Sequence, residues 1–367
     1  MHPRYRILVL GASYGSLLAA KFMLASHDVR LVCLPAEAQL INDEGFRVRL
    51  PVKGRRGLVE VDSRTLPGHV SASGADAADP VEFDLVALAM QEPQYSAPGV
   101  RDLLRRVAVA KVPCMSIMNM PPLAYLARIP GLATVQLRGC YTDATVWDVF
   151  DPALMTLCSP DPQAFRPPEE KMNVLQVSLP TNFKAARFVG DAPTAMLHAL
   201  ARDVETVRFA SPEGPIELPV KLRVHESIFV PLAKWSMLLA GNYRCVLPDR
   251  MRSIRDAVHS DPDASRAVYR FVGDVCRALG ASDADLVPFD KYASAALGLA
   301  KPSSAARALS AGARNIERTD RLVQAVAAQK GMRLAAVDEI VERVNAWLAR
   351  NRATERRAAA TSTAPTM

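Results

Sequence analysis

A glycine turn between an apolar strand and a helix opens the chain, and it constrains the fold more than any other feature. Tyr5–Leu10 is a short apolar run rich in strand-forming residues, Ser16–Ala25 is a helical stretch, and His27–Cys33 is a second strand. Residues 11–15, GASYG, form the turn between the first strand and the helix. This order predicts the βαβ unit with which a doubly wound parallel sheet begins.

Strands and helices continue to alternate as far as about residue 120. Phe46–Leu50 and Leu58–Val61 are predicted to form a hairpin closed by the turn KGRRG. Asp84–Ala89 and Cys114–Met118 are apolar strands of the kind that parallel sheets bury on both faces, with a helix at Arg101–Ala110 between them. The pattern predicts an α/β fold in which residues 1–220 form a Rossmann-like, doubly wound parallel sheet.

Long amphipathic runs replace this pattern in the second half of the chain. They cover residues 225–243, 263–279, 303–328 and 335–349, and they predict an all-helical domain over residues 221–353. Residues 354–367 lack periodicity and are predicted to be a disordered tail. The Pro-rich segment Asp148–Met172 lies between the two patterns, and the sequence leaves open whether it covers the active site or forms an interface.

Composition excludes several classes of function. The net charge of +7 is spread thinly over 367 residues, with no basic stripe between aromatic residues, which argues against a nucleic-acid-binding protein. No apolar run is long enough for a membrane helix. The six cysteines form no CxxC pair and the histidines show no metal-ligand spacing, so we expect buried thiols, no metal site and a cytoplasmic location.

The glycine turn has the position of a phosphate-binding loop. Glycine permits a tight turn after the first strand, so backbone N–H groups at the start of the helix can approach a pyrophosphate. The alternative is a tight turn that binds nothing, and nucleotide binding is the favoured interpretation because the turn lies inside a βαβ unit. The residues expected to contact the cofactor are Gly11, Ala12, Ser13, Tyr14, Gly15 and Ser16.

The end of the second strand does not reveal which nucleotide binds. It reads Cys33-Leu34-Pro35, which supplies neither the acid that would hold a ribose 2′-hydroxyl nor the arginine that would hold a 2′-phosphate. Possible substitutes are Glu37, Arg47, Arg55 and Arg56, although the last two lie in a turn that is more simply interpreted as a solvated one. The choice between NAD and NADP stays open at this point.

Six segments, in order, resemble the ketopantoate reductase (2-dehydropantoate 2-reductase) family. They are residues 7–32 with the glycine turn, 37–50, 116–122 (SIMNMPP), 232–242 (LAKWSMLLAGN), 261–281 and 303–320. The resemblance implies a Rossmann-like domain followed by a helical domain of the type found at the C-terminus of 6-phosphogluconate dehydrogenase. It also implies an oxidoreductase of pantothenate biosynthesis that acts on a small-molecule substrate, uses NADP(H) in preference to NAD(H), and forms a homodimer.

Lys234 is the candidate catalytic residue. Reduction of a 2-oxo acid needs a proton donor for the developing alkoxide, and a lysine is charged at neutral pH and can hydrogen-bond that oxygen. A lone lysine in an apolar helix more often extends to solvent at the edge of the helix. The resemblance implies the catalytic role, which we therefore favour.

The resemblance also assigns roles to other residues, each with a plainer alternative. Asn119, after a parallel strand, and Asn242, eight residues beyond Lys234, would bind substrate, with Asn119 also contacting cofactor; otherwise they are a turn residue and a helix C-terminal residue. Ser304 would bind the substrate carboxylate, or else it caps a helix. Glu317 would contact the nicotinamide or its ribose, or else it is an exposed helix carboxylate. Backbone at Ala144 would meet the cofactor.

Three positions depart from the family pattern and widen the choice of function. Leu238 replaces an asparagine, Met90 (or Gln91) replaces a lysine on the cofactor side, and Asn119 is followed by Met-Pro-Pro where the family has Gly-x-Gly. A bulkier or less polar oxo or imino substrate fits these changes as well as ketopantoate does. Two alternatives follow, a catalytically weakened nucleotide-binding or regulatory protein and an opine or imine dehydrogenase.

Overall fold

The predicted strand, turn and helix at the start of the chain are all present in the computed structural model, which describes the backbone of residues 3–362 and the side chains of residues 3–355. The chain divides into two units. Unit 1 contains the residues up to Arg128 together with Thr145–Pro231, and unit 2 contains Ile129–Ala144 and the residues from Leu232 onward.

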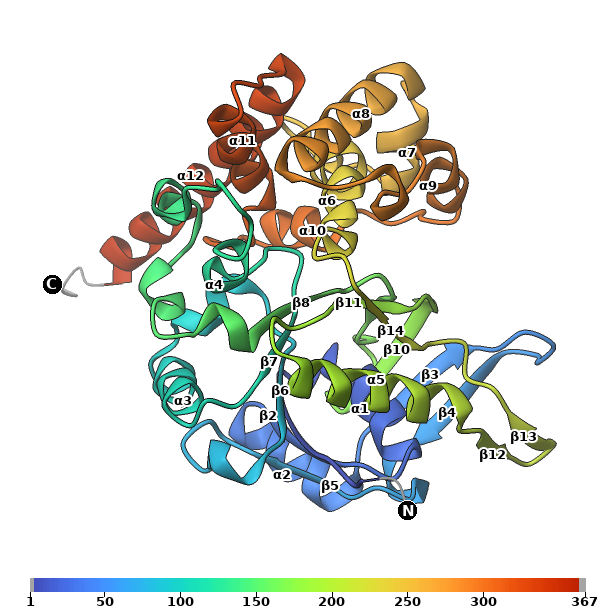
Figure 1. Cartoon of the computed structure of the whole chain (residues 1–367). Helices are drawn as coiled ribbons and strands as arrows, with labels where there is room; N and C mark the ends of the chain where they lie inside the picture. The colour runs from blue at the N-terminus through green and yellow to red at the C-terminus, as the bar shows by residue number, and fades with distance from the viewer. Residues whose placement is uncertain (1–2, 363–367) are drawn as a thin grey trace, which may run out of the picture. The chain divides into compact units, whose positions relative to one another are not determined.

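Unit 1 is built on an eight-stranded sheet with the order β14-β11-β8-β7-β6-β1-β2-β5 (Figure 1). The strands are β1 (Arg6–Leu10), β2 (Asp28–Val32), β5 (Val70–Ser73), β6 (Leu85–Leu88), β7 (Cys114–Ile117), β8 (Met155–Ser159), β11 (Phe183–Ala186) and β14 (Leu222–His225). The six strands from β8 to β5 are parallel, whereas β11 runs antiparallel to β8. The predicted α/β class and parallel sheet are therefore confirmed.

β1 lies at the point where the strand order reverses. Its neighbours are β2 on one side and β6 on the other, and both pair with it in parallel register. In doubly wound sheets, ligands bind beyond the carboxyl ends of the strands at this reversal. The glycine turn directly after β1 therefore has the position that the sequence analysis required of a nucleotide loop.

Both faces of the sheet are apolar and buried. Ile7 and Val9 of β1 belong to a core cluster with residues of α1 and α5, whereas Leu8 and Leu10, which point the other way, are equally inaccessible to solvent. Figure 1 shows α5 lying along the sheet, and α1 packs beside α5. The helices of unit 1 are α1 (Gly15–Leu24), α2 (Pro35–Glu44), α3 (Pro98–Val109), α4 (Leu123–Leu126) and α5 (Asp191–Thr206).

A second, four-stranded sheet in unit 1 joins segments that are far apart in the sequence. Its order is β4-β3-β10-β9, formed by β3 (Arg47–Pro51), β4 (Leu58–Asp62), β9 (Gln163–Phe165) and β10 (Val174–Leu179). The predicted hairpin is β3 and β4, whose register pairs Arg47 with Asp62. The Pro-rich segment thus contributes the edge strand β9 to this sheet, and a small hairpin of β12 (Phe209–Ser211) and β13 (Gly214–Ile216) follows α5.

Unit 2 is helical, as predicted. Its helices are α6 (Lys234–Met237), α7 (Ile254–His259), α8 (Pro262–Leu279), α9 (Phe289–Ala296), α10 (Ser304–Ser310), α11 (Thr319–Gln329) and α12 (Ala335–Ser362). The ends of α8 follow familiar rules, with Asp261 capping the first turn, Pro262 at the first position and Gly280 in the left-handed conformation at the end.

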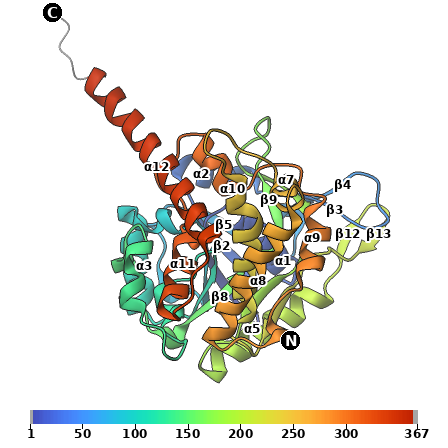
Figure 2. The same cartoon turned by 90° about the horizontal axis from the view of Figure 1, so that it is seen from above.

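The division into units differs from the boundary predicted at residue 220. β14 lies beyond that residue and extends the large sheet, so the change of pattern in the sequence comes before the sheet ends. Residues 129–144 join unit 2 because the short helical segment Thr134–Cys140 packs on α11. Figure 2 shows α12 as one long helix; residues 354–362 of the predicted tail are therefore helical, and residues 363–367 lie outside the described part.

Two predicted helices are also interrupted. The run over residues 225–243 starts at the last residue of β14 and becomes helical only at Val230. The run over residues 303–328 is divided between α10 and α11 around Gly312, which has a φ of 90°. Within residues 3–362, no helix combines the length and the apolar character that crossing a bilayer would demand. The same residues contain no group of three or more His, Cys, Asp or Glu placed to hold a metal ion.

Candidate active site

The glycine turn after β1 depends on both of its glycines. Gly11 has a φ of 106°, and a Cβ atom there would lie 2.7 Å from the carbonyl oxygen of Ala89 at the end of β6. Gly15 begins α1, and a Cβ atom there would lie 2.6 Å from Cγ1 of Val9. The first glycine therefore allows the turn, and the second allows α1 to start directly against the sheet.

The start of α1 is favourable for an anion. No side chain caps the helix, and its first turn contains no acidic residue. The Ser16 hydroxyl donates a hydrogen bond to the carbonyl oxygen of Ala12, which fixes the backbone of the turn. The N-terminus of a helix carries a partial positive charge and N–H groups that point along its axis, so a phosphate would be stabilised here. Ser13, at the position of the usual second glycine, is half-buried.

Tyr14 connects the turn to the segment that follows β8. Its hydroxyl donates a 2.8 Å hydrogen bond to the carbonyl oxygen of Pro162, and its ring meets that of Phe183 edge-on, 5.8 Å between centroids. Burial, followed by the negative charge of Asp161, raises the pKa of Tyr14 well above its usual value. Tyr14 therefore positions the loop as a neutral hydrogen-bond donor.

An ion pair lies near the carboxyl end of β2, and the sequence predicts only one of its two residues. Glu37, in the first turn of α2, accepts a hydrogen bond from Nη2 of Arg166, which follows β9. Both charges act on Cys33 at the end of β2, where burial raises the pKa of the thiol to about 12. The sequence predicts Glu37 as a possible contact to the ribose of the cofactor. It does not predict that Arg166 lies here, because its partner is 129 residues away and its own Pro-rich surroundings give no periodic signal.

The other residues predicted as possible contacts to the ribose 2′-position, which are Arg47, Arg55 and Arg56, lie on the β3–β4 hairpin. Arg47 lies near Glu60 and Asp62 of β4, and Arg55 pairs with Glu213 beside the β12–β13 turn. Arg56 is exposed in the turn itself. Arg56 therefore agrees with the interpretation of the KGRRG turn as a solvated one, whereas Arg55 is held by residues outside the hairpin.

Met90 and Asn119 lie at the same edge of the sheet as the glycine turn. Met90 follows β6, and its Cγ is the atom that a Cβ on Gly11 would approach to 2.7 Å. Asn119 is half-buried just beyond β7, the next strand in the order β7-β6-β1. The position where the family has a lysine is therefore occupied by an apolar side chain directly against the loop, whereas Gln91 is exposed and caps the following 3₁₀ turn.

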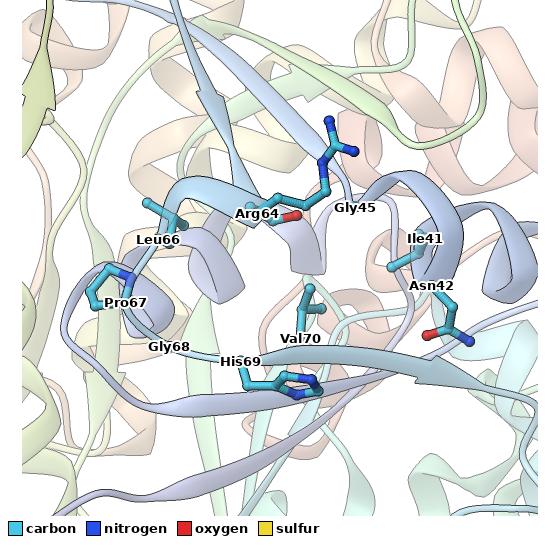
Figure 3. A pocket seen from close by; sticks show the side chains of 10 residues that line it. Ile41, Asn42, Gly45, Arg64, Leu66, Pro67, Gly68, His69 and Val70 are labelled. Carbon is cyan, nitrogen blue, oxygen red and sulfur yellow. The ribbon is translucent and has the colours of Figure 1, made fainter.

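The pocket in Figure 3 belongs to the opposite edge of this sheet. It is lined by Asn42 and Gly45 from the end of α2, by Arg64, and by His69 and Val70 at the beginning of β5. Strands β1, β2 and β5 are parallel, so the beginning of β5 lies away from the carboxyl ends where the glycine turn is found. The Asn42 amide is already satisfied by the backbone of Ala72, at 2.8 and 2.9 Å, so we assign the pocket no role in catalysis.

In unit 2, Lys234 is the first residue of α6 and is only 9% exposed. Trp235 and Leu232 beside it are almost fully buried, and α6 packs on α8. The predicted alternative, a lysine extending to solvent from the edge of a helix, does not describe this position. Lys234 is instead a buried lysine at the first position of α6.

A π-helical segment, η8 (Leu238–Asn242), separates Lys234 from Asn242. Eight residues of a regular α-helix turn about 80° past two full turns. A π-turn contains one residue more per turn, so it rotates Asn242 back towards the line of Lys234. The structure therefore brings the two residues closer to one face than a regular helix would.

Tyr292 accounts for the π-turn. Its hydroxyl donates to the carbonyl oxygen of Met237, 3.1 Å away, and a Cβ on Gly241 would lie 1.9 Å from the same hydroxyl. A side chain inserted into the helical ladder is a recognised cause of such irregularity, and only glycine leaves room for it here. Leu238, which replaces the family's asparagine, is the first residue of this segment and is buried.

Hydrogen bonds at one end of this segment involve the backbone of Asn242 and Glu317 and the serine that precedes Ser304. The carbonyl oxygen of Asn242 accepts a 2.7 Å hydrogen bond from Ser303, and the hydroxyl of Tyr243, next along the chain, donates a 2.5 Å bond to the carbonyl oxygen of Glu317. Glu317 is buried, at 7% exposure, so it is not the exposed helix carboxylate of the alternative interpretation. Around residues 242–243, unit 2 thus brings together the backbone of two of its five predicted site residues, Asn242 and Glu317, with Ser303, the neighbour of Ser304.

Ser303, and not Ser304, is the cap of α10. Its hydroxyl accepts a hydrogen bond from the Ala306 N–H and also bonds Asn242. Ser304 is the first helical residue and is exposed. The capping role considered for Ser304 is therefore filled by its neighbour, and its hydroxyl is not used as a cap.

Ala144 marks the point where the chain passes from unit 2 to unit 1. It is half-buried and is the last residue of the 129–144 segment, which α11 holds through two hydrogen bonds between the Gln329 amide and the backbone of Ala133. The predicted site residues are thus divided: the glycine turn and Asn119 belong to unit 1, and the other five belong to unit 2.

Solved structures similar to this chain share its architecture over almost its whole length. A 2-dehydropantoate 2-reductase from Methylococcus capsulatus aligns with a TM-score of 0.64 at 14% identity, over 94% of this chain and 97% of that chain. A ketopantoate reductase from Ralstonia eutropha JMP134 aligns with a TM-score of 0.59 at 14% identity, over 95% of this chain and 99% of that chain. The chain has the ketopantoate reductase fold.

A third similar structure is D-mandelate dehydrogenase with NADH and anilino(oxo)acetate, with a TM-score of 0.62 at 13% identity, over 95% of this chain and 99% of that chain. No protein-family model matches the chain, and no curated protein matches it. Identities this low show the fold that the sequence segments resembled, and function has to be argued from the site.

Proposed function

We propose that the chain is a nicotinamide-dependent reductase of a 2-oxo acid, of the ketopantoate reductase type, with NADPH as the preferred cofactor. The observation that carries the proposal is the glycine turn at the reversal of the strand order, on a fold shared with ketopantoate reductases and a dehydrogenase described with NADH. The turn has the two features a pyrophosphate needs, close backbone approach at Gly11 and an uncapped helix start at Gly15. The residues therefore fit a dinucleotide.

The reaction requires a proton as well as a hydride. Bound reduced nicotinamide would supply the hydride to the carbonyl carbon. As that C–H bond forms, the carbonyl π bond breaks and its electron pair moves to oxygen. Lys234 hydrogen-bonds this oxygen, stabilises the growing negative charge and transfers a proton from Nζ to give the hydroxyl group. The neutral Lys234 amine then takes up one proton from the bulk solvent, so that each turnover consumes one hydride and one proton.

The neighbouring residues orient the substrate. Asn242 is the last residue of the π-helical segment, and its amide can donate to a substrate oxygen. Ser304, exposed at the first turn of α10, donates to the substrate carboxylate, and Glu317 contacts the nicotinamide or its ribose. Asn119, at the carboxyl edge of the sheet, contacts both cofactor and substrate, and backbone at Ala144 meets the cofactor. These roles follow the family resemblance.

Leu238 directs the choice of substrate. It replaces a polar residue with a buried apolar one between Lys234 and Asn242, which favours a 2-oxo acid with a less polar side chain than that of ketopantoate. The similarity to D-mandelate dehydrogenase, whose name denotes an aromatic hydroxy acid, supports the same direction. Phenylglyoxylate and ketopantoate therefore form an informative pair of test substrates.

The proposal is tested by following NADPH oxidation with ketopantoate and with phenylglyoxylate, each with and without ammonium. We expect turnover without ammonium, and its loss in Lys234→Ala but not in Lys291→Ala, which removes an exposed lysine of the same unit. Turnover only with ammonium would favour an imine or opine dehydrogenase. Nucleotide binding without turnover of any oxo acid would favour a weakened nucleotide-binding protein.

We also infer a homodimer that acts in a reducing compartment such as the cytoplasm. A ketopantoate reductase from Staphylococcus aureus, similar in structure, is described as dimeric. All six cysteines are free thiols, five of them buried, as is usual where glutathione keeps thiols reduced. Light scattering coupled to size exclusion tests the dimer, which predicts twice the chain mass of 39.8 kDa.

A further inference from the structure

The carboxyl end of β2 has two features that point to the adenosine half of a dinucleotide. It lies next to the glycine turn, because β1 and β2 are adjacent and parallel. In doubly wound nucleotide-binding domains, the residue that reads the ribose 2′-position is found at this strand end. Leu34, directly after β2, is a large apolar residue that is 73% exposed, as expected of a side chain that could lie against an adenine ring.

Residues 162–166, here called the strap, connect the two helix starts at this edge. At one end the Pro162 carbonyl oxygen accepts the Tyr14 hydroxyl at the start of α1. At the other end Arg166 bonds Glu37 in the first turn of α2. β9 lies between them and is held by pairing with β10. The strap therefore crosses the region from the phosphate loop to the ribose position.

Arg166 is the accessible member of its ion pair. The Glu37 side chain is 8% exposed and that of Arg166 is 31% exposed. In the part of the chain that the structure describes, the Arg166 guanidinium makes one hydrogen bond, through Nη2 to Glu37. A guanidinium has five N–H donors in a planar fork that suits phosphate oxygens. Glu37 thus holds the group in place while most of its donors stay available.

We propose that Arg166 binds the 2′-phosphate of NADPH and is the residue that makes this chain prefer NADPH to NADH. The inference rests on the proposed function, because it presupposes a dinucleotide in the glycine turn. It supplies the arginine that the end of β2 lacks, from a segment more than a hundred residues further along the chain. Arg166 therefore determines the cofactor, whereas Lys234 determines the chemistry.

The test is the ratio of dissociation constants for NADPH and NADH, measured by titration calorimetry on four forms of the full chain. The wild type is expected to bind NADPH more tightly. Arg166→Ala should weaken NADPH binding roughly 10- to 100-fold, the range for losing a charged hydrogen bond, and change NADH binding less than threefold. Arg166→Lys should recover part of the loss, since it restores the charge without the planar fork.

Arg49→Ala is the matched control. Arg49 lies on β3 in the same four-stranded sheet and pairs with Glu60 and Glu170, so its removal costs comparable ion pairs away from β2. The ratio of dissociation constants should stay at the wild-type value in this variant. If Arg49→Ala changed the ratio of dissociation constants for NADPH and NADH as much as Arg166→Ala does, the change would come from general destabilisation of the sheet. That result would overturn the assignment of Arg166.

The outcomes separate the two proposals. If the wild type binds neither nucleotide, the proposed function fails and takes the role of Arg166 with it. If the wild type binds nucleotides but Arg166→Ala leaves the ratio unchanged, or the wild type binds NADH as tightly as NADPH, the role of Arg166 fails and the reductase proposal stands.

Discussion

Two lysines are buried among the described residues, one in each unit, and they differ in the residues that surround them. Lys21 lies in the last turn of α1 and is 2% exposed, and burial lowers its pKa to about 8. Lys234 begins α6 and is followed by a π-turn, a glycine that accommodates a tyrosine hydroxyl, and Asn242.

The comparison shows that burial alone does not identify a catalytic lysine. The charged residues that influence the pKa of Lys21 are Glu217, Lys221 and Arg208, near the β12–β13 hairpin. None of them is a predicted site residue. Lys234 shares its short helical segment with an irregularity of the kind often found at functional sites. We therefore expect loss of Lys234 to lower activity strongly, and loss of Lys21 to change stability alone.

The largest effect is expected from Lys234→Ala. Removing a general acid should lower kcat by about 10²- to 10⁴-fold. The dissociation constant for NADPH should stay within threefold, because Lys234 is assigned to the substrate oxygen and not to the nucleotide. Steady-state kinetics and nucleotide titration on one preparation measure both. Equal activity of Lys234→Ala and wild type would remove the lysine from the mechanism.

Lys21→Met sharpens the other half of the comparison. The folded state disfavours charged Lys21, so between pH 8 and 10.5 the unfolded state binds more protons and the free energy of unfolding rises with pH. Replacement by methionine should therefore stabilise the protein below pH 8, by at most about 3 kcal/mol.

This gain should shrink as the pH approaches 10.5. Urea unfolding at several pH values measures it, with Lys53→Met, in an exposed turn, as a control that should show no trend. A gain in stability that does not depend on pH would mean that packing, and not the charge, is what the substitution relieves.

Gly241→Ala tests the cause of the π-turn. The added methyl group would meet the Tyr292 hydroxyl, so we expect a loss of about 1–3 kcal/mol in the free energy of unfolding. Tyr292→Phe removes that hydroxyl, and the double variant should recover part of the loss. Additive effects of the two substitutions in a double-mutant cycle would show that the hydroxyl does not hold the turn.

The smallest effects distinguish two adjacent serines. Ser303→Ala removes a helix cap and should cost about 1 kcal/mol of stability. Ser304→Ala should leave stability within about 0.5 kcal/mol and raise the KM for the oxo acid instead. Thermal unfolding and kinetics on both variants decide the assignment, and the reverse pattern would transfer the substrate role from Ser304 to Ser303.

Local signals made the first part of this structure predictable. Glycine at positions 11 and 15, apolar strands and helical periodicity sufficed for β1, the turn and α1, because each depends on residues close together in the chain. The parallel sheet was predictable from the alternation of strands and helices, although its strands, such as β1 and β6, pair across long sequence separations. The division at residue 220 missed β14, because a short strand next to a long helical run leaves little periodic signal.

Contacts between distant residues account for what the sequence could not reveal. The π-turn requires Tyr292 to reach Gly241 from α9, and the charge pair at β2 requires Arg166 to reach Glu37 from the strap. Residues 129–144 show no helical periodicity, and their position is determined by packing against α11. In each case the pairing is set by tertiary packing, which a single sequence does not encode locally.

The most direct test of the account is titration of the purified chain with NADPH and NADH, using wild type, Gly15→Asp and Lys234→Ala. Aspartate at position 15 would place a Cβ against Val9 and a negative charge at the start of α1, so it should abolish binding, whereas Lys234→Ala should keep it. That pattern is the predicted result. Absence of binding by the wild type at millimolar nucleotide would contradict the account and leave only a shared fold.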